Sequence, residues 1–163
     1  MAAALLAAGC GSSKSSQPPT TADWANGVCS AVTTYTKSLK DAAQTLTGNV
    51  SKAGLQDAAD SVKSATDTFV SDTKSLGKPN TNAGQQAKQT LDTLSSQLKT
   101  GESTIEDAAG TGLLQGAAAV TAALATAQTQ VTTAFNELKG LDAKGELSQA
   151  FSQASSCSSL TSS

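Results

Sequence analysis

Four long segments of the chain carry apolar residues at alternating steps of three and four, and this periodicity restricts the fold more than any other feature. The spacing places the apolar side chains on one face of an α-helix. The predicted helices span about 22–47, 52–76, 82–108 and 113–139, and glycine or proline residues follow each of them. Helices of this length joined by short turns pack as an antiparallel up-down bundle. We therefore expect an all-α fold, a four-helix bundle with a short C-terminal fifth helix over about 142–155.

Two glycines interrupt this pattern. Asn26-Gly27 lies in the first turns of the first helix and admits a later helix start, at about Val28. Gly101 falls on the apolar stripe of the third helix, where it marks either a kink or a close contact between helices.

A three-four repeat is also typical of coiled coils between chains, but the charge pairs that such coils use are sparse here. Packing within one chain is therefore the expected use of the stripes.

The chain contains no histidine and no arginine, and these absences narrow the range of functions. Histidine is the commonest catalytic base and the side chain that titrates nearest to neutral pH. Lysine supplies all 11 basic residues, so the two-pronged contact that arginine makes with phosphate or carboxylate is missing. The formal net charge of −2 argues against nucleic acid as a partner. The most apolar stretch, 108–127, contains a glutamine and three glycines, so we do not expect a membrane span.

Two groups of carboxylates deserve comparison with known metal sites. Asp57 and Asp60 lie beside Lys63 in the second helix, where ion pairs on a solvated helix face are the expected arrangement. A denser group, Glu102 with 106 and 107, follows in the third helix. Calcium needs six to eight oxygen ligands that a loop usually supplies, and no such loop pattern occurs. We therefore expect no metal site, and the paired-carboxylate and metal interpretations remain as alternatives.

Serine and threonine are abundant, but the sequence offers little to activate them as nucleophiles. No Gly-x-Ser-x-Gly motif occurs, and no histidine is present. Ser38-Leu39-Lys40 and Ser71-Asp72-Thr73-Lys74 are the nearest serine–lysine combinations, on predicted polar faces. Gly110-Thr111-Gly112 lacks the residues that follow in a phosphate-binding loop, so it predicts a turn. The sequence thus predicts no catalytic residue, no cofactor and no enzyme.

The stretch Leu5-Leu6-Ala7-Ala8-Gly9-Cys10 resembles the lipobox of bacterial lipoproteins, in which an apolar run ends in small residues and a cysteine. The resemblance implies that Cys10 is acylated and that residues 1–9 are part of a signal peptide. No lysine precedes Cys10 and the apolar run is short, so we expect the natural signal to begin upstream of Met1. Residues 10–20 then form the acylated cysteine and a tether, whose Ser/Pro-rich sequence is too polar to fold.

Cysteine counting follows from this assignment. If Cys10 carries lipid, Cys29 and Cys157 remain as one pair near opposite ends of the helical-bundle domain, residues 21–163. An up-down bundle ends its fourth helix at the level where the first begins, so a fifth segment that folds back brings the pair together. We therefore expect a Cys29–Cys157 disulfide. A cytosolic protein with a free Cys10 and two unpaired buried thiols is the alternative.

The layout as a whole resembles small lipoproteins of high-GC Gram-positive bacteria. It comprises the lipobox, the tether, Trp24-Ala25-Asn26-Gly27-Val28-Cys29 at the start of a helical domain, and Cys157 near the C-terminus. The resemblance implies a lipid-anchored location at the extracytoplasmic face of the cell membrane, and no specific activity. Trp24 is expected to plug the end of the bundle, with a membrane-facing anchor or a ligand platform as the alternative.

These patterns predict a non-enzymatic, envelope-anchored module that works by interaction or as an accessory component. Its expected partners are the membrane, through the lipid anchor, and an envelope protein or lipid. The alternative is a small-molecule or lipid-binding module with a cleft between its helices.

Overall fold

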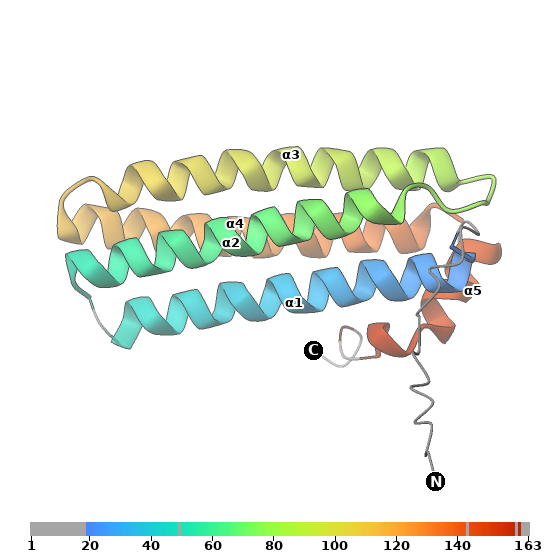
Figure 1. The fold of residues 1–163 in the computed structure, drawn as a ribbon, viewed down its shortest axis with the longest axis horizontal. Coiled ribbons are helices and arrows are strands. Elements are labelled where there is room, and N and C mark those ends of the chain that lie inside the picture. Colours follow the sequence, from blue (N-terminus) through green and yellow to red (C-terminus); the bar gives the residue numbers. More distant parts are fainter. Residues whose placement is uncertain (1–18, 49, 143, 159, 161–163) are drawn as a thin grey trace, which may run out of the picture.

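The computed structural model describes residues 19–48, 50–142, 144–158 and 160. The elements in chain order are α1 (Thr21–Gly48), α2 (Lys52–Leu76), α3 (Gly84–Ala109), α4 (Leu113–Gly140), α5 (Glu146–Gln153) and the 3-10 helix η1 (Ser155–Cys157). The first four run alternately in opposite directions as one bundle, and α5 crosses its end (Figure 1). The prediction of an all-α four-helix bundle with a short fifth helix is confirmed.

The start of α1 is fixed by two residues that satisfy each other's backbone groups. The Asp23 N–H donates to the Thr20 hydroxyl oxygen at 3.1 Å, and the Thr20 N–H donates to the Asp23 carboxylate at 3.3 Å. Such a reciprocal cap satisfies donors that the first helical turn leaves free. Since α1 begins at Thr21, the later start at Val28 that the sequence admitted is wrong.

Asn26 and Gly27 do not form a turn; they lie within α1 and contact neighbouring elements. The Asn26 amide donates to the Ala22 carbonyl at 3.2 Å, and its oxygen accepts from the Ser156 N–H at 3.3 Å, which ties α1 to η1. At Gly27, a Cβ atom would lie 2.4 Å from Cδ2 of Leu76. Glycine therefore lets α1 approach the end of α2 closely, and this contact explains a residue that otherwise weakens a helix.

The four long helices have an uneven cross-section. Neighbours in sequence pack together, and α1 also contacts α4. Across the diagonals, α2 contacts α4, whereas α1 and α3 do not meet within the described part of the chain. At the end where α1 begins, α5 packs against both α1 and α4 (Figure 1). This end of the bundle is therefore closed by the C-terminal segment.

The buried residues follow the predicted apolar stripes. The largest fully buried side chains come from all five α-helices: Trp24, Val28, Tyr35, Leu55, Val62, Phe69, Leu94, Leu98, Ile105, Val120, Leu138 and Leu147. Leu113, predicted to begin the stripe of α4, is instead 41% exposed at the tip of the bundle. Gly101 makes no close helix contact, because a Cβ there would meet nothing within 4 Å, and α3 runs unbroken through it.

A disulfide joins the two ends of the helical region. Cys29 of α1 and Cys157 of η1 are bonded, with their Cα atoms 5.0 Å apart and a separation of 128 in sequence. Both are buried, at 0% and 3% exposure. The predicted Cys29–Cys157 bridge is confirmed, and so is its cause, since α5 folds back from the end of α4 onto the start of α1.

Among the described residues, no helix is both long enough and apolar enough to cross a membrane.

Candidate functional site

Trp24 closes the bundle beside the disulfide. Its ring is fully buried, its indole N–H donates to the Gly77 carbonyl at 3.1 Å, and its edge meets the Phe151 ring at a centroid distance of 5.9 Å. Phe151 in turn packs against Phe135 of α4 at 5.6 Å. These contacts confirm the predicted plug. The alternative of a membrane-facing anchor or ligand platform is wrong, because no face of the ring reaches solvent.

The predicted lipidation site, Cys10, lies outside the described residues, together with residues 11–18 of the expected tether. The described chain begins at Pro19, two residues before the first residue of α1. The first described residues therefore emerge at the same end of the bundle as the plug and the disulfide (Figure 1).

The carboxylates and lysines on facing sides of α2 and α3 form an ion-pair network. Glu102 lies at its centre with a side chain only 6% exposed, and it accepts from Lys63 at 2.8 Å and from Lys99 at 3.1 Å. Lys99 also bonds Asp67, and Lys63 approaches Glu106 at 3.7 Å. Both lysines are nearly half exposed, so water reaches the outer part of the network, whereas Glu102 at its centre is buried.

This network shifts the pKa values of its exposed members in the direction that favours their charged forms. The hydrogen bond to Glu102, and then the attraction of Glu102 and Glu106, raise the pKa of Lys63. Hydrogen bonds to Asp67 and Glu102 raise the pKa of Lys99. The hydrogen bond from Lys99 lowers the pKa of Asp67. The network therefore links α2 to α3 through charges that stabilise one another.

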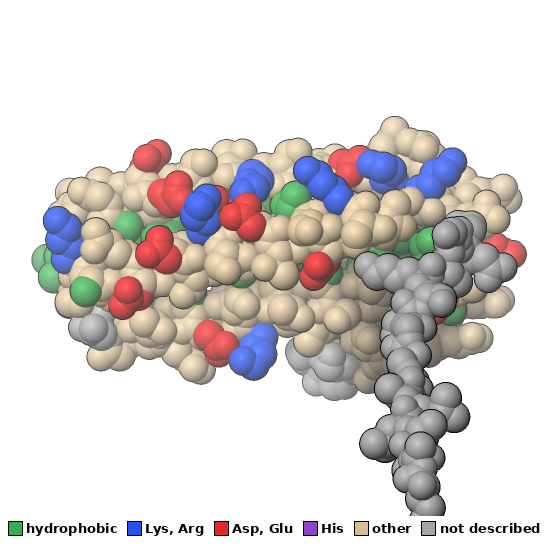
Figure 2. Space-filling view, viewed as in Figure 1, with side chains coloured by type: hydrophobic (Ala, Val, Ile, Leu, Met, Phe, Trp, Pro, Cys, Tyr) green, Lys and Arg blue, Asp and Glu red, His purple; other side chains and the backbone are tan. Residues whose placement is uncertain are grey.

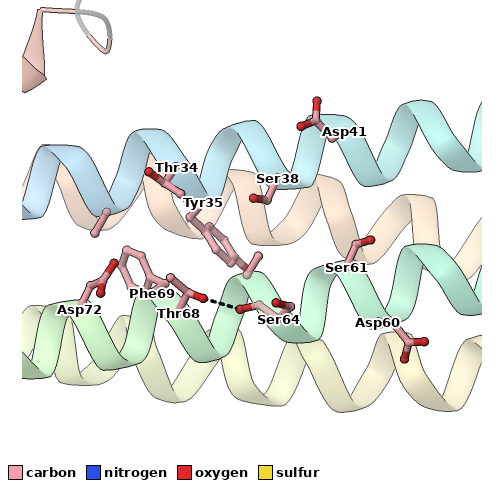
Figure 3. Close-up of a pocket in the computed structure, with 12 residues that line it drawn as sticks. Thr34, Tyr35, Ser38, Asp41, Asp60, Ser61, Ser64, Thr68, Phe69 and Asp72 are labelled. Atoms are coloured by element: carbon pink, nitrogen blue, oxygen red, sulfur yellow. Dashed lines mark hydrogen bonds between the residues drawn. The ribbon is translucent and has the colours of Figure 1, made fainter.

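A groove of about 510 Å³ runs between α1 and α2 (Figure 3). The aromatic rings of Tyr35 and Phe69 lie at its base, with centroids 5.3 Å apart and both side chains buried. Hydroxyl groups and three carboxylates line it: Thr34, Ser38, Ser61, Ser64, Thr68, Asp41, Asp60 and Asp72. Its volume lies within the range typical of small-molecule pockets, about 300–1,000 Å³.

The chemistry of this groove favours cations and hydroxyl groups. Asp41 already pairs with Lys37 at 2.9 Å, and Thr68 donates to the Ser64 carbonyl at 2.8 Å, but hydroxyl and carboxylate oxygens accept further hydrogen bonds. The Tyr35 hydroxyl lies 3.4 Å from the Thr66 hydroxyl beneath the groove, and burial raises the pKa of Tyr35. Tyr35 therefore stays protonated and packs as part of the core.

A second, longer groove lies between α3 and α4. Two adjoining hollows of about 590 and 560 Å³ share three residues, Gln97, Thr126 and Gln130. Glutamine, threonine and alanine make up most of the lining. Unlike the groove between α1 and α2, it offers hydrogen-bonding groups with almost no charge.

The other predicted sites are placed as follows. Asp57 and Asp60 are exposed on α2, and Lys63 pairs across to α3 instead of with them. Ser38 and Lys40 lie two residues apart on α1, where helical geometry points their side chains away from each other. Residues 110–112 form the predicted turn between α3 and α4. Within the described residues, no group of three or more cysteine, aspartate or glutamate side chains is placed to hold a metal ion.

Sequence reasoning missed the burial of Glu102. The prediction placed Gly101 on the apolar stripe between Leu98 and Ile105, although Glu102 fits the three-four spacing equally well. The structure selects Glu102, which is 4% exposed. A signal existed in the sequence, since Lys99 lies three residues before Glu102 on the same helix and can satisfy the carboxylate.

Comparison of the chain with models of protein families, with curated proteins and with solved structures finds no match in any of the three.

Proposed function

We propose that the protein is a lipid-anchored module on the extracytoplasmic face of the cell membrane, and that it works by binding instead of by catalysis. The observation that carries this proposal is the Cys29–Cys157 disulfide, which closes the helical region on itself. Structural disulfides persist mainly in oxidising compartments outside the cytosol.

The disulfide also supports the role of Cys10. It uses two of the three cysteines, and the remaining one ends the stretch that resembles a lipobox. A secreted protein with an odd cysteine count requires a use for the odd residue, and acylation supplies one.

Support for binding comes from the surface of the bundle. Its two grooves lie between neighbouring helices, and each offers several hydrogen-bonding side chains over a rigid scaffold. The chain has no histidine to act as a base near neutral pH. An interaction or accessory role is therefore the function that we propose first.

Replacement of Cys10 by serine tests the anchor. In its native host, the unsubstituted protein is expected in the membrane fraction, released only by detergent, and the Cys10→Ser protein is expected to lose this association. Ser12→Ala, two residues away in the tether, serves as the matched control and leaves the distribution unchanged. Equal recovery of the unsubstituted and Cys10→Ser proteins in the soluble fraction would contradict the proposal.

The groove between α1 and α2 supports a second candidate, a small-molecule or lipid-binding module. Its carboxylates and hydroxyls favour a cationic or polyhydroxylated ligand, or a lipid headgroup of that chemistry, over an acyl chain. Native mass spectrometry of protein isolated from the host distinguishes the two functions. A bound small molecule that is lost when Ser64→Trp fills the groove supports the second candidate. Protein free of such a mass supports the first.

A further inference from the structure

The groove between α3 and α4 is continuous along most of the bundle. Its two halves share Gln97, Thr126 and Gln130, which therefore lie near its middle. It extends along α3 from Gln86 to Thr104 and along α4 from Ala119 to Glu137. Glutamine, threonine and alanine make up most of the lining, and Leu94, Gly101 and Glu137 complete it.

This surface differs from the rest of the bundle in its charge. Glu137, at one end, is the one ionisable side chain among the residues that line the two halves of the groove. The sequence of α4 carries no charged residue from Leu113 to Asn136. Lys99 and Glu102 of α3 face α2, where Lys99 bonds Asp67 and Glu102 accepts from Lys63. Figure 2 shows charged side chains gathered over α2 and α3 on the face it presents.

A surface without charge is inexpensive to remove from water, and the centres of protein interfaces are depleted of lysine, glutamate and aspartate. Glutamine and threonine side chains also carry both a hydrogen-bond donor and an acceptor. Such a surface can satisfy an identical copy of itself, because each donor finds an acceptor without a partner of opposite charge. A two-fold axis brings the same patch of two subunits together in this way.

We infer that the α3/α4 groove is the contact surface of a symmetric dimer, and that its occupant is a second copy of this chain. The size of the surface agrees with this assignment. The groove covers Ala119 to Glu137 of α4, about 27 Å at 1.5 Å per residue, and two helices side by side are about 20 Å wide. A face of about 540 Å² on each subunit gives about 1,100 Å² in total, the size of a small and weak interface.

The middle of the groove is the place where the dimer is tested most directly. Gln97 of α3 and Thr126 of α4 line both halves of the groove, so both lie near its middle. A two-fold axis through the middle of the groove brings them against the partner, whether the axis is parallel or perpendicular to the helices. Thr126 is exposed and its hydroxyl donates to the Ala122 carbonyl of its own helix, at 2.9 Å. Substitutions at these two exposed positions therefore leave the fold of each subunit intact.

The experiment measures the mass of the full chain in solution by sedimentation, with Cys10→Ser present throughout so that neither lipid nor that thiol contributes. The parent protein is expected to dimerise between about 1 and 200 µM, the range for an interface near the lower end of the stable sizes. The paired change Gln97→Lys with Thr126→Lys, and the pair Gln97→Glu with Thr126→Glu, each place like charges against each other. Each is expected to weaken the dimer at least about 100-fold.

Two further samples make the test specific. A mixture of the lysine pair and the glutamate pair restores opposite charges across the axis, and we expect it to form a dimer containing one copy of each. The control is Thr34→Lys with Thr68→Lys, across the groove between α1 and α2. The Thr68 hydroxyl bonds a carbonyl of its own helix at 2.8 Å, as that of Thr126 does. This control is expected to leave the dimer unchanged.

A parent protein that stays monomeric throughout the concentration range overturns the inference, and so does a dimer that survives both charged pairs. A dimer abolished by the control pair alone also overturns it, because the contact then lies at the other groove. None of these measurements involves the lipid anchor, so their failure is separate from failure of the proposed function.

Discussion

Removal of the Cys29–Cys157 disulfide is expected to cost the bundle a large part of its stability. The change is Cys29→Ala together with Cys157→Ala, which opens a loop that spans 128 positions of sequence. In the chain-entropy treatment, a loop of this size lowers the entropy of the unfolded chain by about 17 cal/mol/K, or about 5 kcal/mol at 25 °C. Most domains are stable by only about 5–15 kcal/mol, so this loss is a large fraction of the total.

The assay compares thermal and urea unfolding of the variant that lacks both cysteines with unfolding of the parent chain. The loss of helix is followed by far-ultraviolet circular dichroism. For a helical region of this length, a loss of about 5 kcal/mol lowers the Tm by about 15 °C. Cys10→Ala, outside the bundle, is the matched control and is expected to leave the Tm unchanged. A decrease of less than about 3 °C in the paired variant would refute the reasoning.

The fluorescence of Trp24 shows whether the disulfide stabilises the protein through the unfolded chain or by holding α5 in place. The entropic argument places the effect in the unfolded chain, so α5 is expected to stay docked in the native variant through Phe151 and Leu147. The emission of Trp24, the single tryptophan, then stays that of a buried ring. A red-shifted emission under native conditions, with helix content retained, would show that the bond holds α5 in place instead.

Three further predictions concern the helices. Gly101→Ala is expected to stabilise the protein by about 0.5–1 kcal/mol through helix propensity, since the added Cβ meets nothing within 4 Å. Gly116→Ala, its control in another helix, is expected to lower the Tm, because the Cβ would lie 2.7 Å from the Ala108 carbonyl oxygen. Glu102→Gln is expected to cost about 1–2 kcal/mol in urea unfolding, whereas Glu106→Gln, 45% exposed, costs less than about 0.5 kcal/mol; equal losses would contradict the assigned burial. The lowered pKa of Asp67 gives stability that is present above the ordinary aspartate range and is lost as pH falls through the folded-state pKa. The raised pKa values of Lys63 and Lys99 give stability that is lost at the other end of the pH range, as pH rises past the ordinary lysine range. Asp67→Asn is therefore expected to flatten the acid side of a plot of Tm against pH, and an unchanged acid side would show that its ion pair contributes nothing.

The architecture was predictable because each helix carries its own evidence. The apolar stripe and the Gly77-Lys78-Pro79 stop predict a helix over 52–76, and the structure places α2 at Lys52–Leu76. The disulfide was predictable for a similar reason, since an up-down topology brings residues 29 and 157 to the same end once the number of helices is known. Both inferences depend on local periodicity and on chain direction, which a sequence shows directly.

What the sequence did not reveal depends on contacts between helices. Gly27 looks like a local interruption until Leu76 is seen against it, and Gly101 looks like a packing residue although its surroundings are open. Glu102 looks too polar for a core position until Lys63 of another helix is seen to neutralise it. The two grooves belong to the same class, because each is lined by side chains from two helices whose rotation about their axes is set only by packing.

The central claim is that a disulfide-closed helical bundle is held at the membrane by lipid on Cys10. The most direct test is the intact mass of the protein isolated from its native host. The account predicts a mature chain that begins at Cys10, carries acyl groups and lacks two hydrogens because Cys29 and Cys157 are bonded. A mass without acyl groups, or with free thiols at both Cys29 and Cys157, would contradict it.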